Sequence, residues 1–218
     1  ATRRPLCIYK ENKDVILLPW LQDLPCCGDS HGAVQHYLSL REAWELQEKR
    51  SLARASLLEM GISWHTDSFA QCVREGDTKA VELFLDSGYL PGVRDKHGVP
   101  ILSLAVRSKH QPVAQLALDR GAELDAQSDD RGYTALMDAV QMGDRVMVDF
   151  LLGRGASTDI TSKDGQSALV IAVGRNDVPM SKTLLDAGAN PDLADKLGLS
   201  AKKYAALFHN PDMTALFS

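Results

Sequence analysis

Short apolar segments alternate with polar turns over the last two thirds of the chain. The first segment of each pair has small side chains on one side, at residues 101–106, 135–140 and 168–173. A polar turn follows each of these segments, and a second apolar segment comes next, at residues 113–118, 146–152 and 180–185. Each segment fits two to three turns of helix. The pattern predicts pairs of short helices in close contact.

Two series of glycines give this pattern its period. In one series the spacings are 34, 33 and 33 residues, at Gly98, Gly132, Gly165 and Gly198. In the other the spacings are 33, 34 and 33 residues, at Gly88, Gly121, Gly155 and Gly188. Two series that keep the same period over four copies indicate a repeat protein.

Proline and glycine mark the ends of the second helix in each pair. Pro112 and Pro179 stand at its start, where the first-turn N–H groups have no intrahelical partner. The glycines of the second series follow its last turn. We expect them to be residues of positive φ that end the helix.

These motifs resemble those of the ankyrin-repeat family, whose unit is a turn and two antiparallel helices in about 33 residues. The resemblance rests on Asp-Arg-Gly-Tyr-Thr-Ala-Leu at 130–136, Asp-Gly-Gln-Ser-Ala-Leu at 164–169, Leu-Leu-Asp-Ala-Gly-Ala-Asn at 184–190, and Gly-Ala at 121–122 and 155–156. The family's usual histidine is replaced by Ser103, Met137 and Val170, and the second copy has Lys109-His110 in its turn. The resemblance implies an L-shaped stack with projecting hairpin loops.

We therefore expect an all-α ankyrin-repeat solenoid with four helix–turn–helix units, a C-terminal cap and an N-terminal helical cap. Residues 1–65 form the N-terminal extension and residues 66–218 the repeat domain. The units are expected at about 66–94, 95–128, 129–161 and 162–194, and the cap at 195–218. Thr66 or Asp67 is the expected N-cap of the first unit. The cap should hold one helix, 201–208, and a short tail, 213–217, over the final face.

The N-terminal extension has a different pattern. Residues 33–60 are rich in helix formers and end before Gly61, so they predict one long or two short helices. We expect these to cover the first repeat, with Trp64 as an anchor; the alternative is a helix that binds a partner or dimerises. Residues 1–32 are expected to be irregular, apart from a possible short strand at 15–18.

Composition removes several classes of protein. The 218 residues are 44% hydrophobic and 24% charged, with a formal net charge of −5, as in ordinary globular proteins. No apolar run approaches the roughly 20 residues of a membrane-spanning helix. The 24 basic residues against 29 acidic ones provide no general cationic field for nucleic acid.

Candidate chemistry is confined to Cys26-Cys27-Gly28-Asp29-Ser30-His31. Adjacent cysteines do not match the usual zinc spacing, so a turn with a free or disulfide-bonded thiol is favoured over a thiol or metal function. Cys7 could pair with Cys26 or Cys27, whereas Cys72 fits a buried helix position. The chain has no Gly-rich phosphate loop and no Gly-x-Ser-x-Gly motif. We expect no catalytic site, metal site or cofactor.

The resemblance places recognition on the hairpin tips and the concave face of the inner helices. The corresponding residues are Lys96, His97, Val99, Arg107, Asp130, Arg131, Tyr133, Asp138, Gln141, Met142, Lys163, Asp164, Gln166 and Arg175. Asp138 interrupts an apolar helix, where an unpartnered buried carboxylate would be costly. It either contacts a partner, or it faces solvent or a local hydrogen-bond donor.

The function we expect is non-enzymatic binding of a folded protein, as an adaptor or as a stoichiometric, immunity-type inhibitor. The alternatives are a regulatory fragment of a larger enzyme and a thiol or metal function at Cys26-Cys27. Charges of both signs on the recognition surface favour a protein partner over nucleic acid. Two compartments fit the sequence. One is the cytoplasm, and the other is the bacterial periplasm, which applies if a leader that precedes Ala1 is removed.

Overall fold

The computed structural model describes residues 8–9, 15–16 and 30–217. The chain divides into two compact units, Ala1–Leu46 and Gln47–Ser218. In the first unit, β1 (Ile8–Tyr9) pairs antiparallel with β2 (Val15–Ile16). The strand expected at 15–18 is therefore present at its first two residues. The predictions for Cys7, Cys26 and Cys27 concern positions outside the described residues.

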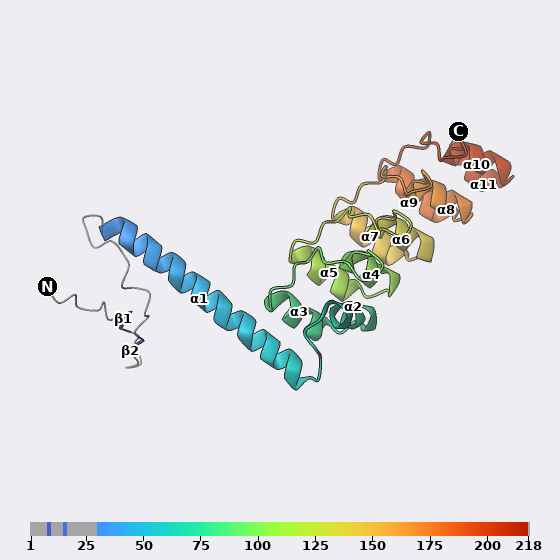
Figure 1. The fold of residues 1–218 in the computed structure, drawn as a ribbon. Helices are drawn as coiled ribbons and strands as arrows, with labels where there is room; N and C mark the ends of the chain where they lie inside the picture. The colour runs from blue at the N-terminus through green and yellow to red at the C-terminus, as the bar shows by residue number, and fades with distance from the viewer. Residues whose placement is uncertain (1–7, 10–14, 17–29, 218) are drawn as a thin grey trace. The chain divides into compact units, whose positions relative to one another are not determined.

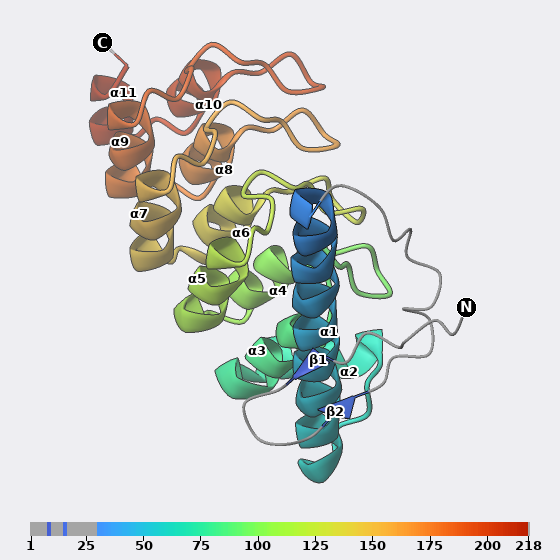
Figure 2. The ribbon, with the colours of Figure 1, turned by 90° about the vertical axis from the view of Figure 1, so that its left-hand side faces the viewer.

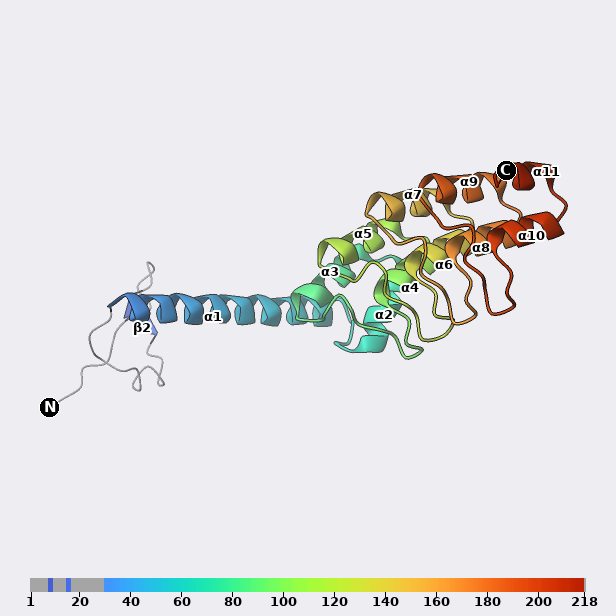
Figure 3. The same cartoon turned by 90° about the horizontal axis from the view of Figure 1, so that it is seen from above.

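The second unit contains five successive pairs of antiparallel helices (Figure 1). The inner helices are α2 (Thr66–Glu75), α4 (Ile101–Arg107), α6 (Ala135–Met142), α8 (Ala168–Gly174) and α10 (Ala201–Leu207). The outer helices are α3 (Thr78–Asp86), α5 (Gln111–Asp119), α7 (Arg145–Gly153), α9 (Val178–Asp186) and α11 (Pro211–Ala215). Figure 3 shows the two layers, and Figure 2 shows the connecting loops projecting from the inner layer. The all-α repeat fold is confirmed.

The core of the stack lies between neighbouring inner helices and beneath the outer layer. All residues of 101–106, 135–140 and 168–173 are buried, because each inner helix packs against one neighbour on either side. Small residues on these helices, such as Ala105, Ala139 and Ala172, are completely buried and allow the close approach. A repeat therefore depends on its neighbours for most of its buried apolar surface.

Both ends of the stack differ in detail from the expectation. The tail after Asn210 forms a short helix, α11, which buries Met213 completely. In α10, the exposed Lys202 and Lys203 stand where α8 has the buried Leu169 and Val170, so the last inner helix is polar on this side. At the other end, the N-cap of α2 is His65, not Thr66 or Asp67. Its backbone is extended, which lets its ring nitrogen Nδ1 accept from the Asp67 N–H at 3.2 Å.

The helix α1 (Ser30–Glu59) precedes the stack in the sequence. Its last turns pack against the first repeat through Ala53 and Leu57, of which Leu57 is completely buried. Trp64 is the expected anchor: its Nε1 donates to Ser87 Oγ at 2.7 Å, and its ring lies beneath the Arg54 guanidinium at 3.9 Å. The described side chains of residues 41–49 are exposed.

A residue in the left-handed conformation follows each inner helix within two positions, but only two of these five residues are glycine. Gly76 and Gly143 have φ values of 78° and 68°. Lys109, Asn176 and His209 occupy the same place with φ values of 61°, 58° and 53°. An L-residue other than glycine is strained there by about 1 kcal/mol, and Asn is the most tolerant of the three. Lys109 therefore introduces avoidable strain into the second repeat.

We predict that Lys109→Gly raises the free energy of unfolding by about 1 kcal/mol, because it removes the strain of positive φ. Equilibrium urea unfolding monitored by circular dichroism measures this change. Lys109→Ala is the matched control, since it removes the same side chain but keeps an L-residue at positive φ. Equal stabilisation by Ala and Gly would show that the effect comes from the lysine side chain.

Candidate functional site

Tight hairpins form the tips of the loops that project from the inner layer. Each hairpin is closed by a backbone hydrogen bond, and a side-chain oxygen of its first residue accepts from backbone N–H groups further along. Asp95 Oδ1, for example, accepts from His97 at 2.9 Å and from Val99 at 3.0 Å. Ser128, Ser162 and Asp195 serve the same purpose in the later hairpins. The sequence therefore fixes each tip locally.

Neighbouring tips are also joined to one another through the backbone. Gly98 O accepts from the N–H of Asp129, Arg131 O from that of Lys163, and Asp164 O from that of Lys196, each at 3.0 Å. The Gln127 amide adds a further bridge, because its Nε2 donates to Gly132 O and to Thr161 O at 2.8 Å. Four successive tips thus form one continuous, hydrogen-bonded row.

We number the hairpins by the repeat that they open, so the second hairpin is residues 95–99 and the third hairpin is residues 128–133. The third hairpin is one residue longer than the other three described hairpins. Its closing pair is Ser128 and Tyr133, five residues apart, whereas Asp95 and Val99, or Ser162 and Gln166, are four apart. This extra residue accounts for the spacing of 34 between Gly98 and Gly132. It also gives this tip the adjacent pair Asp130-Arg131, which lies over the second and third inner helices.

A cluster of charged side chains connects this longer tip to the inner helices. The guanidinium of Arg107, at the end of α4, donates to both oxygens of Asp130 at 2.8 and 3.2 Å. Its Nε donates to Asp138 Oδ2 at 2.9 Å, and Arg131 Nη2 lies 3.6 Å from the other oxygen of Asp138. Asp138 is 1% exposed. The carboxylate that interrupts α6 therefore holds two arginines and does not itself reach the surface.

The two carboxyl groups of this cluster have opposite pKa shifts. Burial raises the pKa of Asp138 to about 6, although the two arginines oppose the change. The hydrogen bonds from Arg107 hold the pKa of Asp130 well below its usual range. Asp130 is thus charged at all ordinary pH values, whereas Asp138 changes its charge under mildly acidic conditions.

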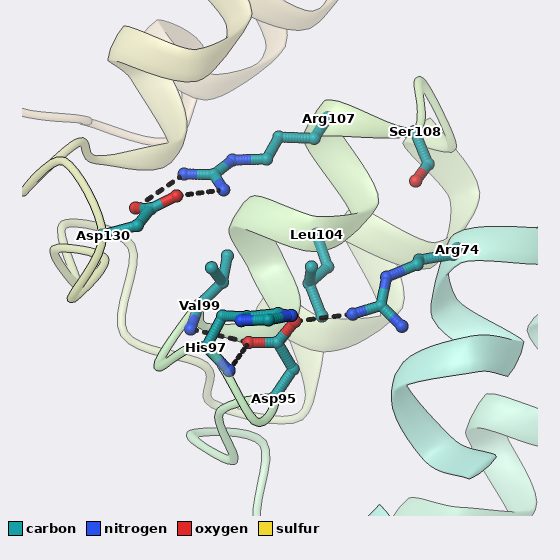
Figure 4. Close-up of a pocket in the computed structure, with 8 residues that line it drawn as sticks. All are labelled: Arg74, Asp95, His97, Val99, Leu104, Arg107, Ser108 and Asp130. Atoms are coloured by element: carbon teal, nitrogen blue, oxygen red, sulfur yellow. Dashed lines mark hydrogen bonds and ion pairs between the residues drawn. The ribbon is translucent and has the colours of Figure 1, made fainter. Parts of the chain in front are cut away.

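A pocket of about 460 Å³ lies between the second hairpin, α4 and the end of α2 (Figure 4). Val99 and Leu104 provide its apolar lining, and Arg107 and Asp130 form one side. On the other side, Arg74 from α2 forms an ion pair with Asp95, at 2.5 Å, beside His97. Burial by itself would raise the pKa of Asp95, but the hydrogen bonds from the backbone N–H groups of Val99 and His97, together with the nearby charge of Arg74, keep this pKa below its usual value.

The structure separates the residues expected at the recognition surface into three groups by their exposure. Val99, Tyr133 and Asp138 are buried and support the surface from below. Arg107, Gln141 and Gln166 are half-buried, and the exposed members are Lys96, His97, Asp130, Arg131, Met142, Lys163, Asp164 and Arg175. Tyr133 lies under the Arg131 guanidinium at 4.7 Å, and Arg175 donates to Gln141 O at 2.6 Å.

Four residues of the pocket were not among those expected from the sequence: Arg74, Asp95, Leu104 and Ser108. Arg74 precedes Arg107 by 33 residues, one repeat period, so alignment of the first unit would have placed both arginines at the same position. Asp95 is the first residue of its hairpin, the position that Ser128 and Ser162 hold in later copies. Its second carboxylate oxygen, which serine lacks, is the one that binds Arg74.

The described part of the chain offers few groups for other chemistry. It contains no cluster of three or more His, Cys, Asp or Glu side chains arranged to bind a metal ion. Cys72 is buried, as expected, and burial raises the pKa of its thiol. None of the described helices combines the length and apolar character needed to cross a bilayer.

We predict that the stability of the protein relative to its Asp138→Asn variant falls as the pH rises from about 4 to about 7. In the unfolded chain an aspartate has a pKa of about 3.9, whereas the folded protein retains this proton up to about pH 6. Ionisation within that window thus opposes folding, by about 3 kcal/mol in total. Urea unfolding of both proteins over this pH range measures the difference. The free energy of unfolding of the protein minus that of Asp138→Asn should fall with pH. If this value stays constant or rises, the pKa of Asp138 is not raised.

Comparison with known proteins agrees with this architecture. Residues 69–164 match the family described as ankyrin repeats (3 copies), and residues 164–196 match a further ankyrin repeat. A putative ankyrin repeat-containing protein of Treponema pallidum (strain Nichols) is 45% identical over 175 residues, which cover 80% of this chain and 59% of that protein. The ankyrin repeat and SAM domain-containing protein 6 of Mus musculus is 37% identical over 68 residues, which cover 31% of this chain and 8% of that one.

The chain therefore spans 59% and 8% of the lengths of these two relatives. Among solved structures, the ankyrin repeat domain of Bcl-3, a member of the IkappaB protein family, superposes with a TM-score of 0.61 at 28% identity. The superposition covers 69% of this chain and 66% of that chain. With five helix pairs, projecting hairpins and matches across residues 69–196, the chain belongs to the ankyrin-repeat family.

Proposed function

We propose that this protein binds a folded protein partner through its inner surface, the exposed side chains of the hairpin tips and inner helices. It would act by occupancy, as an adaptor or as a stoichiometric inhibitor. Ankyrin repeats indicate a protein–protein interaction module, and members of the family are generally non-enzymatic. The observation that carries the proposal is the continuous row of hydrogen-bonded tips, which presents polar side chains from four repeats on one scaffold.

Preorganisation of the tips favours binding by this surface. Each tip is fixed by its own side-chain bonds and by its neighbours, so little backbone freedom remains to be lost when a partner binds. The supporting residues are also fixed, because Tyr133 and Asp138 are buried beneath the third tip. A surface of this kind suits a folded partner whose own shape is already defined.

The side chains of the inner surface suit a protein epitope. Lys96, Arg131 and Lys163 alternate along the tips with acidic residues such as Asp164, and Met142 contributes an exposed apolar side chain from α6. Arginine and methionine are enriched in protein interfaces, and charges of both signs allow a specific match with a partner. The outer helices supply no row of loops comparable to the tips.

We predict that crosslinks to a partner form from the inner surface and not from the outer helices. A photo-crosslinking amino acid would replace Met142 or Asp164 on the inner surface, and Asp149 of α7 or Lys182 of α9 as matched exposed positions on the outer layer. Illumination in cells that express the protein naturally, followed by mass spectrometry, identifies the crosslinked chains.

The expected result is one and the same protein crosslinked from both Met142 and Asp164, with little or none from Asp149 and Lys182. Crosslinking of that protein mainly from the outer positions would place the binding surface elsewhere. Circular dichroism of each variant verifies that the repeats remain folded, which is expected because all four side chains are exposed.

A further inference from the structure

The pocket beside Arg74 has an apolar lining between charged walls. Val99 and Leu104, which are 3% and 5% exposed, form the apolar lining. Arg74 and Arg107 reach it from the ends of two successive inner helices, and Asp95 and Asp130 reach it from two successive hairpins (Figure 4). It therefore lies where the row of tips meets the inner helices of the first two repeats.

The carboxylates of this pocket are already occupied. Asp95 accepts from two backbone N–H groups through Oδ1 and from Arg74 through Oδ2. Asp130 accepts from Arg107 through both oxygens, and also from its neighbour's backbone N–H. With three of about four acceptor positions used on each carboxylate and an arginine beside each charge, these groups have less to offer a cationic side chain of a partner than free carboxylates would.

Several hydrogen-bond donors of the pocket, in contrast, are not used within the described structure. Arg74 donates from Nη2 alone, so its Nε and Nη1 remain available on a side chain that is 36% exposed. The imidazole of His97, which is exposed, and the hydroxyl of Ser108 make no hydrogen bond to any described residue. Figure 4 shows the imidazole beside the ion pair of Arg74 and Asp95. The spare capacity of the pocket thus consists mainly of donors.

We propose that this pocket receives an acidic side chain of the protein partner. The carboxylate would accept from Arg74, with His97 and Ser108 as further donors, and the methylene groups of the same side chain would lie on Val99 and Leu104. This inference rests on the proposed function, and adds to it the chemistry of the partner: an acidic segment that crosses the tips of the second and third repeats.

A single carboxylate fits this site better than a phosphate group does. The positive charges of Arg74, Arg107 and Arg131 are balanced by the negative charges of Asp95, Asp130 and Asp138, so the local net charge is zero. Directional donors can bind one additional negative charge in such surroundings, whereas a dianion would be repelled by three carboxylates. The net charge of −5 acts in the same direction against a nucleic acid.

The test uses a short fluorescein-labelled peptide of alternating glutamate and leucine, and measures fluorescence polarisation with the full chain at low ionic strength. The comparison probes are a single-stranded oligonucleotide and three peptides that have glutamine, lysine or phosphoserine in place of glutamate. We expect the glutamate peptide to bind at least about tenfold more tightly than each of the others, because it is the one probe that supplies a carboxylate.

Variants of the pocket should weaken binding of the glutamate peptide. Arg74→Gln should lower the affinity for the glutamate peptide about tenfold or more. Lys182→Gln, which removes one exposed positive charge from α9, should change this affinity little. Arg74 also neutralises the buried Asp95, so the double variant His97→Ser and Ser108→Ala provides a test that leaves every described hydrogen bond of the fold in place. The affinity of this double variant for the glutamate peptide should fall severalfold.

Any of three results would overturn the inference. The glutamate and glutamine peptides could bind equally well, or the lysine, phosphoserine or oligonucleotide probe could bind more tightly than the glutamate peptide. The third such result is that both pocket variants bind the glutamate peptide as tightly as the unaltered protein does. These outcomes are independent of the crosslinking experiment. If the partner crosslinks from Met142 and Asp164 but the peptide assay shows no preference for glutamate, the proposed binding surface stands and only the proposal of an acidic partner segment is refuted. A preference for glutamate with crosslinks from the outer helices would refute the proposed binding surface.

Discussion

Contact between neighbouring repeats is the constraint on which the structure depends. An inner helix of seven or eight residues is too short to be stable alone in water, and its apolar residues are buried only because a similar helix lies on each side. The row of hairpin tips repeats this dependence in the backbone, since a tip donates to the carbonyl group of the preceding one. Stability and the geometry of the recognition surface therefore have the same origin.

The charged cluster around Arg107 connects these two parts of the molecule. Arg107 belongs to an inner helix, Asp130 to a hairpin tip and Asp138 to the next inner helix, so one guanidinium fixes the position of a loop relative to two repeats. Ionisation of this buried carboxylate opposes folding even with two arginines beside it, as its raised pKa indicates. Its partners make it a positioning element for the surface above it.

The periodic features of the fold could be predicted from the sequence, because they depend on local rules that recur in every copy. The glycine series gave the repeat, and the helix pairs followed from the apolar segments. The features that were missed are unique to one copy or arise between copies. Alignment of the copies places Arg74 and Arg107 at one position, but it does not show that Arg74 pairs with Asp95, 21 residues away. The burial of Val99 and Tyr133 depends on packing against other repeats.

The longer third hairpin shows how such a chain can accommodate change. Its additional residue is absorbed within the tip, and the regular register returns by Lys163, whose N–H reaches Arg131 O just as Lys196 reaches Asp164 O. An insertion that would shift every later strand in a large sheet is here confined to a single loop. Selection can therefore remodel one site of contact at a time, while the remaining copies keep their shape, and a lineage can change its ligand without rebuilding its framework.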